Sequence, residues 1–322
     1  MGIDTIGVLT SGGDAPGMNA AVRSVVRAAL TRGLKVFGIR RGYSGLITED
    51  IEEMSIRSVS DIIHRGGTIL YTARSHTFRT EEGMKKAVDV CGRHGIGGVV
   101  TIGGDGTFRG ARDLSHRGIL CVGLPGTIDN DISSSEYTIG YDTAMNTAVE
   151  MVDKIRDTSQ SHERCTVVEV MGRNCGSLAV GVGVAVGATA VVVPEVQFDL
   201  ERDIIATMRR TQLTGKKHFI IIVAEGVGKV NELAKEIERV TGVETRATVL
   251  GHVQRGGSPS AHDRIMASRM GVKAVELLSE GIGNQVVAVK GGRIVSYDID
   301  KALAMDSVFD EELFTIAHEI SI

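Results

Sequence analysis

The sequence predicts an α/β protein with two Rossmann-like lobes, each built on a mainly parallel sheet covered by helices. Short β-branched runs alternate with amphipathic helical segments along the whole chain, a pattern typical of parallel sheets with helices on both faces. The length of 322 residues favours two domains over one. Glycine accounts for 41 of the 322 residues, roughly 13%, against an ordinary share of about 7%. This excess predicts many tight loops between elements.

The expected elements follow in a regular order. Runs of β-branched residues predict strands at 5–9, 36–39, 99–102, 121–124, 165–170, 190–193, 219–224 and 247–250. Apolar residues at helical spacing predict helices at 18–30, 81–94, 143–156, 203–213, 231–240 and 262–278. Residues 285–298 predict a hairpin that turns at two consecutive glycines. The uncharged stretch 175–194 is long enough for a membrane span, but its glycines favour a buried helix followed by a strand.

No Pro- or Ser-rich linker divides the chain, so we expect the polypeptide to cross between the lobes more than once. The predicted first lobe holds residues 1–139 and about 252–303, and the second holds 140–251 and about 304–322. These boundaries fall in loops between expected elements.

Composition and the first residues disfavour several classes of protein and partner. The 36 Lys and Arg residues against 40 Asp and Glu give a net charge of −4, which disfavours nucleic acid as a partner. Four widely spaced cysteines without a CxxC pair fit a reducing compartment. The first residues lack a basic region and lead directly into a strand, so we expect no signal peptide, no membrane association and a cytoplasmic location.

A glycine-rich loop follows the first expected strand. Residues 10–17 read TSGGDAPG and lead into a helix. Because Gly12 and Gly13 lack a Cβ, backbone N–H groups there can approach an anion at the helix start. The loop matches neither GxxxxGK[ST] nor GxGxxG, and a tight strand-to-helix turn explains it equally well.

Two further loops carry carboxylates at expected strand ends. The sequence GGDGT at 103–107 surrounds Asp105 with glycines, so the backbone can line phosphates while the carboxylate reaches a hydrated magnesium ion. The sequence PGTIDND at 125–131 projects Asp129 and Asp131 to the same side if the loop is extended. One carboxylate could then accept a proton while the other supports a metal or its partner's geometry; an Asx-rich turn is the alternative.

Arginines recur beside these expected strand ends. Arg74 is the candidate bridge to a phosphate, and a guanidinium makes bidentate, permanently charged contacts with phosphate oxygens. A single arginine is more often a solvated surface group, whereas several beside glycines or histidines favour an anion site. The others are Arg164, Arg173, Arg246 and Arg255, and His252 lies close by in GHVQRGG.

In this order the motifs resemble those of bacterial-type ATP-dependent 6-phosphofructokinases. The resemblance covers nearly the whole chain and includes TSGGDAPGMNAAVR, GGTILYTAR, GGDGT, PGTIDND, IGYDTA, KIRDTSQSH, VMGRNCG, VVVPE, VAEG and TRATVLGHVQRGGSP. It implies the phosphofructokinase fold, with ATP bound by the first lobe and fructose 6-phosphate by the second. It also implies a homotetramer and transfer of the γ-phosphoryl group of MgATP to the sugar 1-hydroxyl, a committing step of glycolysis that yields fructose 1,6-bisphosphate and ADP.

The resemblance further implies roles for single residues. Asp129 is the expected general base, with Thr127 and Arg173 completing the catalytic set. The expected ATP contacts are Gly12, Arg74, Ser75, Gly104, Asp105, Gly106 and Thr107, with Asp105 also holding Mg²⁺. The expected sugar contacts are Thr127, Asp129, Arg164, Met171, Gly172, Arg173, Glu225, Arg246, His252 and Arg255. In the family, Arg164 and Arg246 belong to a neighbouring subunit's site.

An effector site for ADP or phosphoenolpyruvate is also implied by the resemblance. Its matching residues are Arg23, Arg27, Asp61, Arg156, Lys216 and His218. Three positions depart from the family pattern: Thr189 replaces a common Glu, Thr214 a common Arg and Arg57 a common aromatic. We therefore expect weakened or altered control by effectors.

Three other functions compete with this interpretation. Pyrophosphate-dependent relatives typically carry Asp where this chain has Gly106 and Lys where it has Gly126, so both positions favour ATP. An NAD- or lipid-kinase-like protein shares GGDGT but does not explain TIDND, MGR and GHVQRGG together. A phosphosugar sensor without catalysis could lose Asp129, which is present here.

Overall fold

The computed structural model describes residues 3–321, which form two compact units. Within the described residues, the first unit runs from Ile3 to Ile128 and also holds Ile132–Thr143 and Arg255–Ser307. The second holds Asp129–Asp131, Ala144–Gln254 and the chain from Val308 to Ser321. The chain thus changes unit a few residues after each predicted boundary. One reason is that the start of helix α5 (Tyr141–Ser161) is hydrogen-bonded to Asp263 of the first unit. The assignment of residues 129–131 to the second unit was not predicted.

The first unit contains a seven-stranded sheet in the order β11-β10-β5-β4-β1-β2-β3. The central strands β1 (Thr5–Thr10), β2 (Lys35–Ile39), β4 (Gly98–Gly103) and β5 (Leu120–Pro125) pair in parallel, and β10 (Gln285–Lys290) pairs parallel to β5. The edge strands β3 (Ile51–Glu53) and β11 (Arg293–Asp298) are antiparallel. The predicted hairpin at 285–298 is therefore confirmed.

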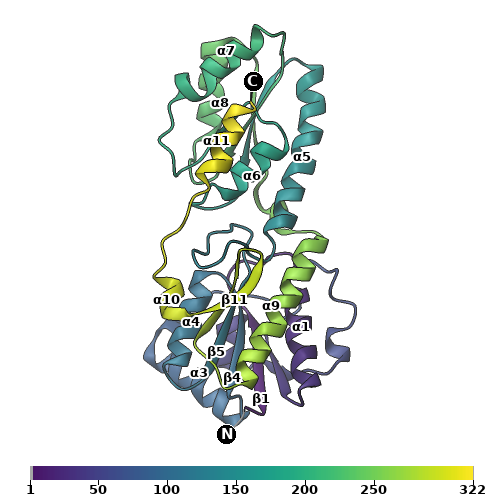
Figure 1. Cartoon of the computed structure of the whole chain (residues 1–322), viewed down its shortest axis with the longest axis vertical. Helices are drawn as coiled ribbons and strands as arrows, with labels where there is room; N and C mark the ends of the chain where they lie inside the picture. The colour runs from purple at the N-terminus through teal and green to yellow at the C-terminus, as the bar shows by residue number, and fades with distance from the viewer. Residues whose placement is uncertain (1–2, 322) are drawn as a thin grey trace. The chain divides into compact units, whose positions relative to one another are not determined.

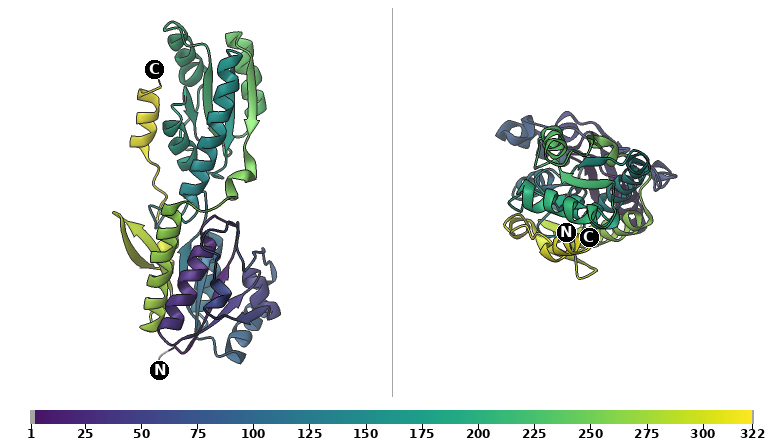
Figure 2. Two further views of the ribbon diagram at one scale, coloured as in Figure 1. Left: turned by 90° about the vertical axis from the view of Figure 1, so that its right-hand side faces the viewer. Right: turned by 90° about the horizontal axis from the view of Figure 1, so that it is seen from above.

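Helices cover both faces of this sheet, as Figure 1 shows. On one face, α1 (Met18–Thr31) and α9 (Ala261–Ser279) run side by side (Figure 2). The other face carries α2 (Gly42–Thr48), α3 (Glu81–Arg93), α4 (Asp105–Ser115) and α10 (Ile299–Leu303). A core of fully buried residues such as Leu9, Phe108 and Leu114 lies between this second layer and the sheet.

The second unit contains a parallel four-stranded sheet in the order β7-β8-β6-β9. Its strands are β6 (Cys165–Val170), β7 (Ala190–Val192), β8 (Phe219–Ala224) and β9 (Thr245–Val249). Helices α7 (Ala206–Gln212) and α8 (Val230–Thr241) pack on one face through a buried cluster that includes Met208 and Ile237. Helix α6 (Ser177–Ala185) packs against β8, and α11 (Glu311–Glu319) packs against α6 and β7.

The α/β class and all eight expected strands are confirmed. The uncharged stretch 175–194 forms α6 and β7, as predicted. The segment expected as one helix at 203–213 instead begins with a π-helical turn at Glu201–Ile205 and continues as α7. None of the helices within residues 3–321 combines the length and apolar character that crossing a membrane requires.

Candidate active site

The carboxyl end of β1 is joined to two neighbouring loops of the first unit. Backbone N–H of Ser11 donates to the Ile102 carbonyl at 2.9 Å. Thr72 donates its hydroxyl proton to the Gly12 carbonyl at 2.7 Å. Gly12 has φ +89°, a backbone conformation that disfavours residues with a Cβ. The glycines of this loop therefore serve its fold, and they also leave backbone groups accessible to a ligand.

The GGDGT loop forms the start of α4. Gly104 is the N-cap residue and Asp105 the first residue of the helix, where its carboxylate is exposed. Thr107 is buried, and its hydroxyl donates to the Ser11 carbonyl at 3.2 Å, which ties this loop to the first one. The structure thus gives the Thr107 side chain a structural contact. Gly106 lies exposed in the first turn with ordinary helical φ, and nothing lies within 4 Å of an added Cβ.

A third segment, residues 68–75, lies beside the same strand end. The Thr10 hydroxyl donates to the Tyr71 carbonyl at 2.8 Å. Ser75 accepts a hydrogen bond from the Phe78 backbone at 3.2 Å, which starts the turn that follows. Arg74, between these anchored positions, is exposed to solvent. The structure therefore brings Gly12, the GGDGT loop and the Arg74 segment together at the carboxyl ends of the central strands of the first unit's sheet.

The end of β5 meets the same edge. Backbone N–H of Gly126 donates to the Gly103 carbonyl at 3.0 Å. The carbonyl of Thr127 accepts the Thr138 hydroxyl proton at 2.6 Å, and Thr127 is buried. These bonds fix the segment that leads directly along the chain to Asp129.

In the second unit, both carboxylates of the DND sequence face one guanidinium. Asp129 is 3% exposed, and its Oδ2 lies 4.0 Å from Nε of Arg173. An Asp131 oxygen lies 4.0 Å from an Nη atom of the same arginine. Since Arg173 is largely exposed, it can contact a ligand while balancing the buried Asp129 charge. A buried carboxylate next to a cation and a solvent-facing surface suits proton transfer.

The backbone at Arg173 adopts an uncommon conformation. Its φ is +55°, in the left-handed region that residues with a Cβ rarely enter. Glu225 stabilises this turn, since its Oε1 accepts a hydrogen bond from the Arg173 N–H at 2.6 Å. The preceding Gly172 has φ +133°, and a Cβ there would lie 2.5 Å from the Cys175 carbonyl oxygen. The MGR sequence thus forms a turn with two consecutive positive φ angles, and this turn sets the position of the Arg173 side chain.

Two residues near this turn were missed by sequence reasoning. Glu169, at the end of β6, has a pKa raised by burial and by the nearby Glu225 charge. Gln254 is fully buried, accepts a hydrogen bond from Met171 N–H at 3.4 Å and donates to the Gly251 carbonyl at 3.0 Å. Gln254 therefore joins the Met171 turn to the segment that carries the exposed His252. The position of Gln254 inside the GHVQRGG motif is the sequence feature that could have identified it.

Arg255 lies in the first unit, against the first glycine-rich loop. It donates to the Asp14 carbonyl at 3.3 Å, and a Cβ at Gly13 would lie 2.7 Å from its guanidinium nitrogen. The absence of a Cβ at Gly13 thus leaves room for the Arg255 guanidinium in this position.

Arg164 and Arg246 lie at the amino ends of the strands of the second unit's sheet, whereas Arg173 follows the carboxyl end of β6. Arg164 precedes β6, and Arg246 is the second residue of β9, so both are at the amino ends of parallel strands. Glu244 pairs with both arginines at 2.7 Å. The six residues of β6 separate this pair from the Met171 turn, a distance of roughly 20 Å. Within the second unit, the structure does not bring these two arginines to the Arg173 turn.

The expected effector residues of the second unit, Arg156, Lys216 and His218, form a cluster of basic side chains. Arg156 donates a hydrogen bond to the Val186 carbonyl. The pKa values of Lys216 and His218 are lowered, first by burial and then by the nearby Arg156 charge. In the first unit, burial and the neighbouring Arg27 charge lower the pKa of Arg23. Asp61, on the same unit, has φ +54°. Each unit therefore holds part of the expected set.

The departures from the family pattern occupy defined places. Thr189 is buried, and its hydroxyl has no hydrogen-bond partner among residues 3–321. Thr214 donates its hydroxyl proton to the Thr211 carbonyl at 2.7 Å, near the end of α7. Neither side chain offers a charge, and the Thr214 hydroxyl is used locally.

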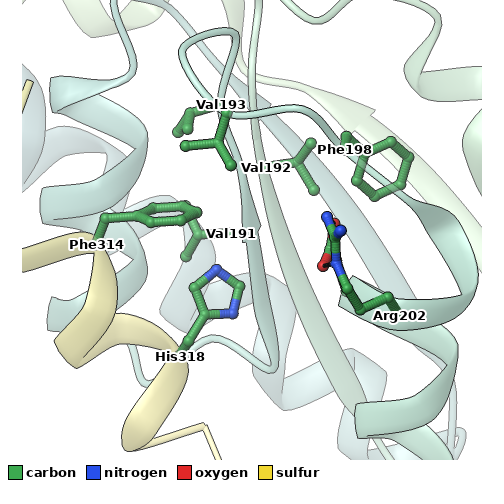
Figure 3. Close-up of a pocket in the computed structure, with 9 residues that line it drawn as sticks. Val191, Val192, Val193, Phe198, Arg202, Phe314 and His318 are labelled. Carbon is green, nitrogen blue, oxygen red and sulfur yellow. Dashed lines mark hydrogen bonds and ion pairs between the residues drawn. The ribbon is translucent and has the colours of Figure 1, made fainter. Parts of the chain in front are cut away.

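A cavity of about 250 Å³ lies elsewhere in the second unit, between β7 and α11. Figure 3 shows Val191, Val192 and Phe314 on its wall, with Arg202 and His318 at its side. None of the residues expected to bind ATP, sugar or effector lines this cavity.

No group of three or more His, Cys, Asp or Glu side chains within the described part of the chain could hold a metal ion. Magnesium is usually bound by one or two carboxylates together with substrate phosphates. The single exposed carboxylate of Asp105 at a helix start fits that mode of binding and does not fit a resident metal held by protein alone.

Comparisons with known proteins identify the family of this chain. The phosphofructokinase family model matches residues 5–278. The chain belongs to the phosphofructokinase family. It is 58% identical over 317 residues to an ATP-dependent 6-phosphofructokinase of Clostridium botulinum, a match that covers 98% of this chain and 99% of that protein. Family membership thus extends along nearly the entire sequence.

Solved structures support the same fold. A phosphofructokinase from Saccharomyces cerevisiae superposes with a TM-score of 0.89 at 34% identity, covering 98% of this phosphofructokinase-family chain and 46% of the yeast chain. The chain therefore spans about half the length of that relative. A pyrophosphate-dependent phosphofructokinase from Marinobacter aquaeolei, 21% identical, has a TM-score of 0.84 and covers 96% of this chain and 86% of its own. Since that protein shares the fold, the fold alone does not identify the phosphoryl donor.

Proposed function

We propose that this chain is an ATP-dependent 6-phosphofructokinase, which transfers the γ-phosphoryl group of ATP to the 1-hydroxyl of fructose 6-phosphate. The observation that carries the proposal is the buried Asp129 carboxylate facing the exposed Arg173 guanidinium at 4.0 Å. The near full-length similarity to an ATP-dependent 6-phosphofructokinase supports the same activity. The products are fructose 1,6-bisphosphate and ADP.

Asp129 acts as the general base in this proposal. It accepts the proton of the sugar hydroxyl as the new phosphorus–oxygen bond forms. Arg173 stabilises part of the negative charge that spreads over the transferring group. Glu225, bound to the Arg173 backbone, holds the guanidinium ready for that contact.

ATP binds along the loops at the carboxyl edge of the first unit's sheet, where Gly12, Asp105 and Arg74 lie. The start of α4 offers its N–H groups to phosphate oxygens. Asp105 would hold Mg²⁺, which when bound neutralises part of the phosphate charge. Fructose 6-phosphate binds at the Met171, Arg173, Glu225 and His252 positions of the second unit.

Two glycines favour ATP over pyrophosphate. Gly106 leaves open space beside Asp105, where pyrophosphate-dependent relatives typically carry an aspartate. Gly126 is buried, and a Cβ there would lie 3.0 Å from Cγ2 of Ile102 and 3.3 Å from Cε of Met18. A lysine at this position would require these neighbours to shift, so the surroundings of Gly126 are adapted to glycine.

We also propose a cytoplasmic homotetramer in which subunits share sites. Arg164 and Arg246 lie at the sheet edge opposite the Arg173 turn, so contacts from these arginines to a sugar phosphate are best supplied to a neighbouring subunit. The cluster of basic side chains formed by Arg156, Lys216 and His218 supports an anionic effector. Because Thr189 and Thr214 lack charge, that effector site is expected to respond weakly.

The test is a coupled assay of the purified protein that measures fructose 1,6-bisphosphate. ATP and pyrophosphate are compared as donors, each with and without fructose 6-phosphate. We expect product only with ATP and sugar together. Turnover with pyrophosphate instead of ATP would reject the proposed donor, and phosphoryl transfer from ATP without the sugar would reject the acceptor.

A further inference from the structure

One fully buried carboxylate of the first unit has no part in the proposed reaction. Asp263, the third residue of α9, is 0% exposed. Its Oδ1 accepts hydrogen bonds from the Tyr137 hydroxyl at 2.5 Å and from Gly140 N–H at 2.6 Å. Its Oδ2 accepts from both the backbone N–H, at 2.9 Å, and the hydroxyl of Thr143. Four donors on two oxygens match an ionised carboxylate, which only accepts hydrogen bonds.

The surroundings of Asp263 favour a negative charge. Burial, followed by the charge of Asp263, raises the pKa of Tyr137 far above its usual value, so the phenol remains a donor. Three helices begin at this place: α9 after its N-cap Ser260, α5 with Thr143 in its first turn, and α1 after Gly17. A Cβ at Gly17 would lie 3.5 Å from Cβ of Asp263. Helix starts carry partial positive charge, so they stabilise a carboxylate placed among them.

The segment held by Asp263 is bonded to the candidate active site. Backbone N–H of Ile139 donates to the Pro125 carbonyl at 2.9 Å, and the Thr138 hydroxyl donates to the Thr127 carbonyl at 2.6 Å. Between them in sequence, the backbone N–H of Gly126 donates to the carbonyl of Gly103, the last residue of β4, at 3.0 Å. A continuous set of hydrogen bonds therefore runs from Asp263 through residues 137–143 to the ends of β5 and β4.

We propose that Asp263 is a positioning residue for phosphoryl transfer. It fixes residues 137–143, which in turn hold Pro125–Thr127, the segment that delivers the chain to Asp129. This inference rests on the proposed function, because it assigns Asp129 and the GGDGT loop their chemical roles. A misplacement of about 1 Å in such a segment lowers turnover by roughly 100-fold even when the substrates still bind.

The test uses two substitutions that weaken the same network differently. Asp263→Asn keeps the shape but turns one acceptor into an amide donor that faces other donors. Thr143→Val keeps the volume and removes the hydroxyl that binds Asp263 and accepts from Ser260 N–H. Ser24→Ala is the matched control: the buried Ser24 hydroxyl contacts the carbonyls of Ala21 at 2.8 Å and Ala267 at 3.2 Å. It thus joins the same helices α1 and α9, without a bond to the loops.

For each variant, kcat, both KM values, the melting temperature and hydrogen exchange at residues 123–128 are measured. We expect kcat to fall at least about 10-fold in Asp263→Asn and Thr143→Val, with either KM changing by less than about 3-fold. Exchange at 123–128 should be faster in both, while Ser24→Ala keeps kcat near the wild-type value. If Asp263→Asn does not fold, the kcat and the hydrogen exchange of Thr143→Val test the proposal instead.

Wild-type kcat in a folded Asp263→Asn or Thr143→Val protein would overturn the proposal. Unchanged exchange at 123–128 would do the same, because the effect would then not pass through this segment. An equal loss of kcat in Ser24→Ala would show general loosening of the two helices instead. If the wild-type protein makes no fructose 1,6-bisphosphate, the proposed function fails, while the exchange measurement still decides whether Asp263 holds the loop.

Discussion

Replacing Gly106 by Asp is expected to weaken ATP binding without destabilising the protein. Gly106 is the second residue of α4, its backbone is not left-handed, and nothing lies within 4 Å of an added Cβ. The substitution therefore creates no steric conflict. Removing a helical glycine and adding an acid to the first turn together contribute about 0.5–1.5 kcal/mol of stability. The melting temperature should stay constant or rise by about 1–4 °C.

The effect on ATP has the opposite sign. An additional carboxylate about 5 Å from a phosphate charge costs about 0.8 kcal/mol in a water-like dielectric and about 3 kcal/mol at an effective dielectric of 20. Because position 106 is exposed, the cost should lie in the lower part of this range, about 1–2 kcal/mol. The KM for ATP should therefore rise roughly 5- to 30-fold. Added salt should reduce the difference, since it screens exposed charges.

Steady-state kinetics of Gly106→Asp, Gly106→Asn and Gly106→Ala, with a thermal melt of each, separate charge from shape. Asparagine matches aspartate in size but carries no charge, so its KM for ATP should change far less. The reasoning is refuted if folded Gly106→Asp binds ATP as well as wild type does. It is also refuted if Gly106→Asn raises the KM as much, because the effect would then be steric.

Two further outcomes test the site and its regulation. Asp129→Ser should lower kcat by about 10²–10⁴-fold with modest changes in KM, because it removes the base and leaves most substrate contacts; retention of more than roughly a third of wild-type kcat would contradict the assigned role. Fructose 6-phosphate saturation, measured with and without MgADP or phosphoenolpyruvate, should shift only weakly. A large shift in half-saturation would show that the uncharged Thr189 and Thr214 do not impair effector binding.

Much of the fold could be predicted from the sequence because each strand carries its own signal. The run Phe219–Ala224 is apolar throughout, and the structure buries all of it as the central strand β8. The short edge strand Ile51–Glu53 was not predicted, because two of its three residues are charged and exposed. Helix α11 was missed too, since it packs mainly through contacts that only the folded second unit provides.

The site was predicted unevenly, for similar physical reasons. Glycines and carboxylates at strand ends identified the loops, because their chemistry is local to a few residues. The pairing of Glu225 with the Arg173 backbone could not be predicted from composition or spacing, since the two residues are far apart in sequence. Asp263 was overlooked because a serine followed three residues later by an acid suggests only the start of a helix. Asp263 does contribute to the start of α9, since its backbone N–H donates to the Ser260 hydroxyl oxygen.

The strand order of the first unit has a consequence for synthesis on the ribosome. Strand β5 pairs on one side with β10, which lies far downstream, beyond the main part of the second unit. While the ribosome makes the residues in between, β5 is an unpaired edge of a buried parallel sheet. Such edges bind other chains and promote aggregation. The nascent protein is therefore expected to need protection, for example by a chaperone, until the hairpin at 285–298 emerges and closes the sheet.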